Sequence, residues 1–179
     1  MNTAEHLINA IRNKAQQCTS FIAVVPATSG AIGEAERSLG FPIPELLKAI
    51  YLEVGNGGFG PDYGIIGVRG GHASSAGTLV ETLEDMIRGA EYLGGTWERH
   101  ILPFCDRGCA SFTCVDCKDS SHPIFGAEEC VAHPMRYDLS TFFRRWVSDG
   151  ALDASSDAAR TAINPVTGEK IVIPQPRRP

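Results

Sequence analysis

The sequence predicts an α+β protein, in which N-terminal helices pack on a mostly antiparallel sheet from the second half of the chain. In the first half, apolar residues recur at the three-to-four-residue spacing of a helix face. In the second half, short apolar and β-branched runs alternate with polar turns. We therefore expect a domain over residues 1–149. From Gly150 the composition shifts to Ala, Ser and Asp, which predicts a C-terminal extension over 150–179, with a hairpin ending in 170–173 and packed on the domain.

The first helix is predicted to begin at Asn2 or Thr3, because either side chain can cap it and Glu5 completes a capping box with Asn2. Its buried face is predicted to carry Leu7, Ile8, Ile11, Ala15 and Cys18. The following segment, 19–27, contains an apolar and β-branched run. It is predicted to be a short strand or an extended connector, and both stay open.

Two short helices are predicted next. The second helix begins at Ser29 or Gly30 and stops at Gly40. The third begins at Pro44, whose fixed φ suits a first helical position, and ends at Gly55, which tolerates left-handed backbone. The apolar face of this third helix consists of Leu46, Leu47, Ile50, Tyr51 and Val54.

A strand at 63–68 and a Gly- and Ser-rich loop at 69–77 are predicted before the fourth helix. Thr78 and Glu81 form a capping box, which marks the start of this helix. Its buried stripe is predicted to consist of Leu79, Leu83, Met86, Ile87 and Ala90.

Three short strands are predicted in the second half, at 100–104, 110–116 and 122–126. Ser140 is predicted to cap a closing helix. The apolar face of that helix consists of Leu139, Phe142, Phe143, Trp146 and Val147.

The glycine-rich stretch after the third helix contains Gly55-x-Gly57-x-x-Gly60, the spacing of a dinucleotide-binding fingerprint. That fingerprint binds pyrophosphate between a strand and the start of a helix, where backbone N–H groups point at the phosphates. Here the glycines follow a helix and precede a strand. The order of elements therefore predicts a tight turn and no bound nucleotide or other cofactor.

Several short motifs follow one another in a distinctive order. They are Ile-x-x-x-Glu-x-x-Leu-Gly at 32–40, Pro-x-x-hydrophobic from Pro44, Asn-Gly-Gly at 56–58, Ile-Leu-Pro-Phe at 101–104, a glycine turn, the strand ending in Asp116, Pro-Ile-Phe at 123–125 and the helix from Ser140. Over roughly residues 30–148 the chain thereby resembles the SMI1/KNR4 family, also called the SUKH superfamily. Asn56, Gly57, Gly58 and Asp116 match family positions, and we expect them to shape turns.

Composition narrows the function classes. The chain of 179 residues is 43% hydrophobic with a mean hydropathy of -0.07, values typical of a soluble globular protein. Its net charge of -5 disfavours nucleic acid as a direct partner, because phosphates attract Lys and Arg. No apolar run reaches the ~18 residues of a transmembrane helix, and the N-terminus lacks the pattern of a signal peptide. We therefore expect a cytoplasmic protein that contacts no membrane.

Five of the six cysteines lie in the second half, at Cys105, Cys109, Cys114, Cys117 and Cys130. Cys114-x-x-Cys117 has the spacing of a zinc knuckle, but no second pair of this spacing accompanies it. If 110–117 is one strand, these two side chains lie on opposite faces and cannot share a metal ion. The cysteines are then small buried hydrophobes in a reducing cell, and no metal site is predicted.

Glu81, Glu84 and Asp85 form an acidic cluster on the fourth helix, and Trp97 follows two glycines. Charge runs are most often solvated faces, and Trp97 fits the core at least as well as an interface. As a functional hypothesis, these four residues contact a basic protein partner. No nucleophile lies in a recognisable arrangement with a base, so no catalytic residue is predicted.

Most bacterial members of the SMI1/KNR4 family look like immunity proteins, so the resemblance implies a non-catalytic protein that binds a cognate toxin. Many such toxins are nucleases or other nucleic-acid enzymes, whose basic grooves an acidic surface could occupy. Two alternatives stay open. One is a regulatory scaffold, as the family's eukaryotic members suggest, and the other is a small zinc-binding protein that uses the Cys105–Cys130 cluster.

Overall fold

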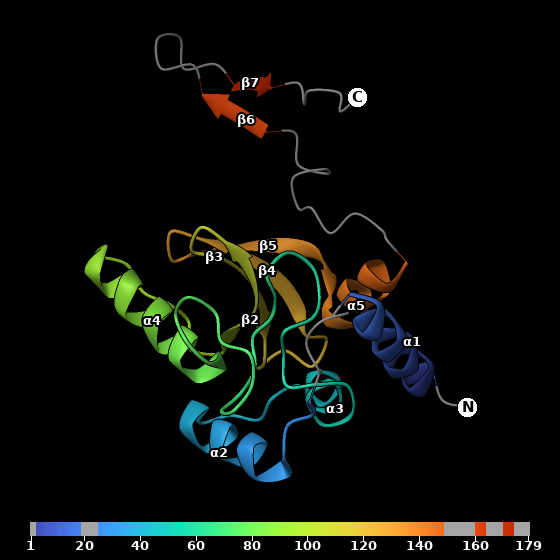
Figure 1. Cartoon of the computed structure of the whole chain (residues 1–179). Helices are drawn as coiled ribbons and strands as arrows, with labels where there is room; N and C mark the ends of the chain where they lie inside the picture. The colour runs from blue at the N-terminus through green and yellow to red at the C-terminus, as the bar shows by residue number, and fades with distance from the viewer. Residues whose placement is uncertain (1–2, 19–24, 149–159, 164–169, 174–179) are drawn as a thin grey trace.

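The computed structural model describes residues 3–18, 25–148, 160–163 and 170–173. In these residues the chain forms helices around one antiparallel sheet, which confirms the α+β prediction (Figure 1). The helices are α1 (Thr3–Cys18), α2 (Ser29–Leu39), α3 (Glu45–Glu53), α4 (Leu79–Tyr92) and α5 (Leu139–Val147). The strands of the sheet are β1 (Gly64–Ile65), β2 (Ile101–Gly108), β3 (Ser111–Asp116), β4 (Pro123–Glu128) and β5 (Val131–Asp138).

The sheet has the order β1-β2-β3-β4-β5, and every neighbouring pair is antiparallel. It lies between α4 on one side and α1 with α5 on the other, while α2 and α3 lie at one end (Figure 1). Phe104 of β2 packs on Phe142 and Phe143 of α5, with ring centroids 5.1 and 6.2 Å apart. The helices of the first half and the sheet of the second half therefore share a single hydrophobic core.

The N-terminal helices lie where they were predicted from the sequence, but their ends differ in detail from the prediction. Thr28 caps α2, because its Oγ1 accepts a hydrogen bond from the backbone N–H of Ala31 at 3.1 Å. Pro44 takes the cap position of α3 and is not its first helical residue. Cys18, expected on the buried face of α1, is exposed, since it is the last residue of the helix.

Residues 25–27 form an extended connector, whereas 19–24 lie outside the described residues. Two backbone hydrogen bonds hold the connector against α3 and the glycine turn. Ala27 N–H donates to the carbonyl of Tyr51, and Asn56 N–H donates to the carbonyl of Val25, both at 2.8 Å. Because these bonds join it to a helix end and a turn, the segment does not extend the sheet.

The glycine turn after α3 is organised around the buried side chain of Asn56. Its Oδ1 accepts from the backbone N–H of Val68 at 2.8 Å, and its Nδ2 donates to the carbonyls of Val68 and Arg69. The expected strand at 63–68 shortens to the two residues of β1, since Gly67 N–H donates to the carbonyl of His72 and Val68 N–H donates to Asn56 instead of continuing the ladder with β2. As expected, Asn56 shapes a turn.

The sequence interpretation missed β5 altogether. The turn before β5 consists of Glu129 and Cys130, both with positive φ (50° and 57°), which is the backbone of a type I′ hairpin turn. Such turns usually carry Asn or Gly, so nothing in this dipeptide signals a hairpin. Because β5 was not predicted, the predicted cap of α5 was also wrong. Asp138, the last residue of β5, accepts from Thr141 N–H at 2.7 Å and caps the helix in place of Ser140.

In the extension, β6 (Arg160–Ile163) pairs antiparallel with β7 (Lys170–Ile173). The residues that connect the two strands lie outside the described part of the chain. The packing of the extension on the domain stays a prediction. Among the described residues, no helix has the length and apolar character to cross a membrane.

Candidate partner-binding surface

Glu81, the first of the predicted contact residues, is engaged at the start of α4. Its Oε2 accepts hydrogen bonds from the backbone N–H and the hydroxyl of Thr78, at 2.7 and 2.8 Å. The backbone bond is the main cause that lowers the pKa of the Glu81 carboxyl, since both bonds favour its charged form. Glu81 also lines a small hollow of about 190 Å³ between α2 and α4.

Glu84 and Asp85 each have an arginine partner. Glu84 pairs with Arg99, whose guanidinium also reaches the carbonyls of Ser38 and Leu39 at the end of α2. Asp85 pairs with Arg88 one turn later, at 3.2 Å. Of the acidic cluster, Glu84 therefore helps to hold the segment after α4 against α2 through Arg99, whereas Asp85 pairs within its own helix.

Trp97 is buried and lies away from the Glu81 hollow. Its indole Nε1 donates to the carbonyl of Ile101 at 2.9 Å, so its polar atom is satisfied within the protein. Trp97 lines a larger groove at the other end of α4. The structure thus does not gather the four predicted residues into one site.

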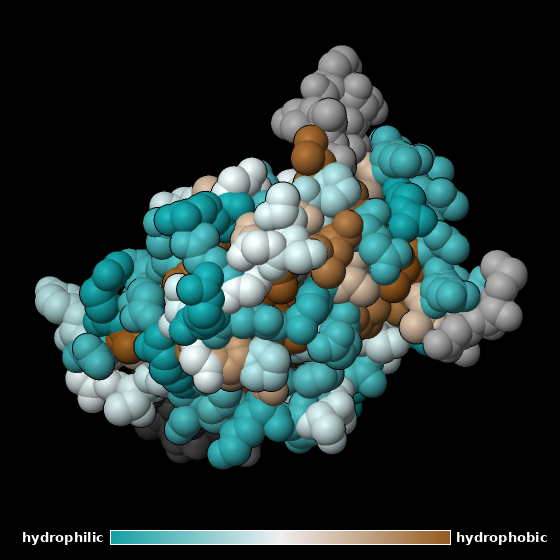
Figure 2. All heavy atoms as spheres, turned by 90° about the horizontal axis from the view of Figure 1, so that it is seen from below, coloured by the Kyte–Doolittle hydropathy of each residue, from teal (hydrophilic) through white to brown (hydrophobic). Residues whose placement is uncertain are grey.

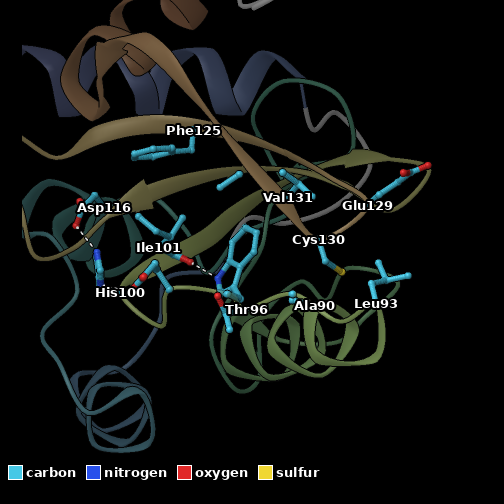
Figure 3. A pocket seen from close by; sticks show the side chains of 14 residues that line it. Ala90, Leu93, Thr96, His100, Ile101, Asp116, Phe125, Glu129, Cys130 and Val131 are labelled. Carbon is cyan, nitrogen blue, oxygen red and sulfur yellow. Dashed lines mark hydrogen bonds and ion pairs between the residues drawn. The ribbon is translucent and has the colours of Figure 1, made fainter.

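This larger groove has a volume of about 550 Å³, and we call it the α4–hairpin groove. It runs between the last turn of α4 with the segment after it, and the turn that joins β4 to β5. Ala90 and Leu93 face Cys130 and Val131 across it (Figure 3). Because the missed strand β5 forms one of its walls, the sequence interpretation did not predict the groove.

The lining of the groove is mainly apolar. Its floor includes Ile101 of β2 and Phe125 of β4, together with the Trp97 indole. Leu93 and Val131 are more than half exposed at its mouth, and the neighbouring Tyr92 is almost fully exposed. By contrast, the face seen from below in Figure 2 is mostly hydrophilic, with small, separate hydrophobic patches.

The two walls touch at one point, where Gly89 of α4 meets Cys130. An ideal Cβ built on Gly89 would lie 2.5 Å from the Sγ of Cys130, closer than real side chains approach. The hairpin turn therefore packs directly on the helix backbone. This close approach sets the width of the groove at that end.

Apart from Thr96, Trp97 and Cys130, the side chains with polar groups at the groove are three carboxylates and one histidine. Glu98 and Glu129 lie at its edge, and His100 lies between the carboxylates of Glu98 and Asp116, at 3.9 and 3.8 Å. Asp116 also accepts from the backbone N–H of Lys118 at 2.8 Å, so it shapes the turn after β3 as expected. Among the described residues that line the groove, none is Lys or Arg.

Comparison with known proteins decides the family. A family model described as SMI1/KNR4 (SUKH-1) matches residues 26–142, well over half of the chain. The chain belongs to the SMI1/KNR4 family. Members of this family are typically non-catalytic immunity proteins. No curated protein matches the chain.

In this SMI1/KNR4 protein, two of the five cysteines of the second half, Cys105 and Cys114, are buried, Cys117 and Cys130 are partly buried, and Cys109 is exposed. Burial is the main cause that raises the pKa of Cys105 and Cys114, and it raises the pKa of Cys117 to about 12. Zinc binds the thiolate form, so a metal ion at these thiols would have to offset the cost of burying the thiolates. Within the described ranges, no three His, Cys, Asp or Glu residues are placed to hold a metal ion.

The position of Cys117 differs from the one expected. β3 ends at Asp116, so Cys117 lies just beyond the strand and donates its thiol hydrogen to the carbonyl of Val115 at 3.8 Å. Because Cys117 lies outside the strand, strand alternation does not place its side chain and that of Cys114 on opposite faces.

Proposed function

We propose that this SMI1/KNR4 protein is an immunity protein that binds a cognate toxin in the cytoplasm and blocks it stoichiometrically. The observation that carries the proposal is the family match over residues 26–142, since members are typically immunity proteins. The toxin that we propose is a nuclease or another nucleic-acid enzyme with a basic substrate groove.

Charge supports this choice of partner. The whole chain has a net charge of -5. α4 contains four acidic residues (Glu81, Glu84, Asp85 and Glu91) against one arginine, which gives the helix a formal charge of -3. An acidic helix beside an exposed apolar groove suits a basic protein surface, because opposite potentials steer encounter and apolar burial holds the complex.

The test is co-expression with the toxin encoded by the neighbouring gene. The two proteins should co-purify as a complex with equal numbers of each chain. Protection of cells should rise with the amount of this protein and be complete only when it at least equals the toxin. Full protection by amounts far below those of the toxin would contradict the proposal, because only a catalytic antidote can protect in that way.

A further inference from the structure

We infer that the α4–hairpin groove is the docking site for the toxin, and that it receives one apolar side chain from a toxin segment whose neighbouring residues are Lys or Arg. The inference rests on the proposed function, because it assigns a surface to the same partner. The acidic cluster on α4, the contact site expected from the sequence, has internal arginine partners. The groove instead places the main contact of the complex at the C-terminal end of the helix.

Exposed apolar side chains are concentrated at this groove. Among the described residues, the exposed large hydrophobic side chains are Val25, Tyr63, Tyr92, Leu93 and Val131. Three of these five lie at or beside the groove, although they come from α4 and β5. Such a patch is costly in water and gains free energy when a partner covers it.

The size and shape of the groove suit an inserted side chain. Its volume of about 550 Å³ falls within the range of about 300–1,000 Å³ that is usual for binding clefts. It is open along one side, so it can admit a side chain from another protein. Interface anchors are typically apolar or aromatic side chains that fill such pockets, surrounded by a polar rim.

The rim of the groove is acidic. Glu98, Asp116 and Glu129 are near the apolar floor, whereas the nearby Arg99 bonds to Glu84 and to carbonyls of α2. A toxin segment that places its apolar side chain on the floor would bring its flanking residues to these carboxylates. Lys or Arg at those flanking positions would be attracted, and Asp or Glu would be repelled.

The groove is formed before binding. The contact of Gly89 with Cys130 sets its width, and the hydrogen bond from Trp97 to Ile101 fixes the orientation of the indole on its floor. A pre-formed site loses less conformational entropy on binding.

Two pairs of matched variants test the inference. The binding of each variant is measured to the toxin encoded by the neighbouring gene, which is made inactive by substitution of a catalytic residue. Val131→Asp places a charge at the groove, and Val25→Asp places one at another exposed valine outside the groove (52% and 67% exposed). Glu98→Lys reverses a rim charge, and Glu45→Lys reverses a glutamate of similar side-chain exposure on α3 (76% and 87%). Thermal unfolding of each variant checks that the fold is retained.

We expect Val131→Asp to weaken the equilibrium affinity on the order of tenfold to a hundredfold, and Val25→Asp to leave it unchanged. Glu98→Lys should slow association several-fold at low salt, and Glu45→Lys should slow it less, because it acts only through the net charge. If both groove variants bound the toxin as tightly as the wild-type protein does, the groove would not be the docking site. The proposed immunity role would stay intact, because the wild-type protein still binds the toxin. A wild-type protein that does not bind the toxin would contradict the proposed function itself.

Photo-crosslinking identifies the occupant. Leu93→benzoylphenylalanine should crosslink to an apolar toxin residue with Lys or Arg beside it, and mass spectrometry locates that residue. Tyr63→benzoylphenylalanine is the control at an exposed aromatic position outside the groove. Crosslinks from position 93 to an acidic toxin segment, or equal crosslinking from both positions, would contradict the inference.

Discussion

Asn56 shows how a single residue can specify a turn. Its side chain bonds to the backbone of Val68 and Arg69, and two glycines, Gly67 and Gly71, approach Asn56 so closely that a Cβ on either would overlap its atoms. An ideal Cβ on Gly71 would lie 2.2 Å from the Asn56 Cγ, and one on Gly67 would lie 2.4 Å from its carbonyl oxygen. The turn is thus built by close packing around one amide, and the glycines serve this packing.

We predict that Gly57→Ala destabilises the protein more than Gly70→Ala. Both glycines have positive φ (77° and 82°), so each substitution costs about 1–2 kcal/mol from backbone strain. At Gly57 the new Cβ would also lie 2.5 Å from the carbonyl oxygen of Ile65, whereas Gly70 has open space. The overlap should add at least about 1 kcal/mol. Urea unfolding measures both variants, and equal losses would show that the turn relaxes.

Thiol reactivity is predicted to divide the cysteines by exposure. Cys18 and Cys109 are exposed and should react quickly with Ellman's reagent in the folded protein. Cys105 and Cys114 are buried with a raised thiol pKa, so they should react only after unfolding. A Cys18→Ser, Cys109→Ser double variant should lose the fast phase.

The same burial predicts free thiols without stoichiometric zinc. Elemental analysis of the purified protein checks this prediction. About one zinc per chain, lost in Cys114→Ser, would show instead that the thiols are held as thiolates by a metal ion.

At the scale of elements, α4 links the two parts of the domain. Its first turn is capped by Thr78 and Glu81, its acidic side is tied to α2 through Arg99, and its last turn packs on the β4–β5 hairpin. The capping box was evident in the sequence because it is local. The contact with the hairpin was not, because it joins residues that are far apart in the chain.

The capping carboxylate predicts a pH dependence of stability. Hydrogen bonds from Thr78 lower the pKa of Glu81 in the folded state below its ordinary value of 4.5. The contribution of Glu81 to the free energy of unfolding is therefore complete at pH values above this ordinary pKa. It is lost as the pH falls through the lower pKa of the folded state. The difference in free energy of unfolding between wild type and Glu81→Gln should be constant near neutral pH and should disappear in acid. A gap that persists unchanged at low pH would contradict this, and Glu91→Gln, on the same helix, is the control.

A double-mutant cycle tests the packing of Gly89 against Cys130. Alanine is favoured over glycine within a helix by about 0.8–1 kcal/mol, so Gly89→Ala should stabilise α4 if space allows. In the wild-type background the new Cβ would meet the Sγ of Cys130, which should cancel or reverse the gain. In a Cys130→Ala background the gain should reappear in the free energy of unfolding. Additive effects of the two substitutions would show that the elements do not touch.

At the scale of the whole molecule, the charge distribution predicts how association begins. The net charge of -5 and the acidic α4 should attract a basic toxin over distances comparable to the screening length. The apolar groove acts only at contact. The charge should therefore affect the association rate constant, and the groove should affect the dissociation rate constant.

We predict that association with a basic cognate toxin slows about tenfold as salt rises from about 50 to 500 mM, while dissociation changes little. Asp85→Lys should slow association about two- to threefold at low salt, because Asp85 is exposed and adds to the field of α4. Stopped-flow kinetics with the catalytically inactive toxin measures both effects. An unchanged association rate in Asp85→Lys would remove the acidic side of α4 from the encounter.

Much of this fold follows from local signals in the sequence. Helical spacing predicted α2 and α4 to within a residue or two, and apolar runs predicted β2, β3 and β4. The order of short motifs indicated the SMI1/KNR4 family, which the family match confirmed. These signals are readable because the period of apolar residues, a capping box and a glycine at a helix end depend on neighbours within a few positions.

The tertiary structure alone decided where a binding surface lies. β5 follows a turn with neither Asn nor Gly, so its pairing with β4 provides the stability that the turn sequence does not. That strand brings Val131 opposite Leu93, and Glu98 and Glu129 onto one rim. The sequence determined the family, the helices and the acidic character of α4. The groove depends on contacts between α4 and a hairpin some 40 residues away, and no local pattern of residues specifies such contacts.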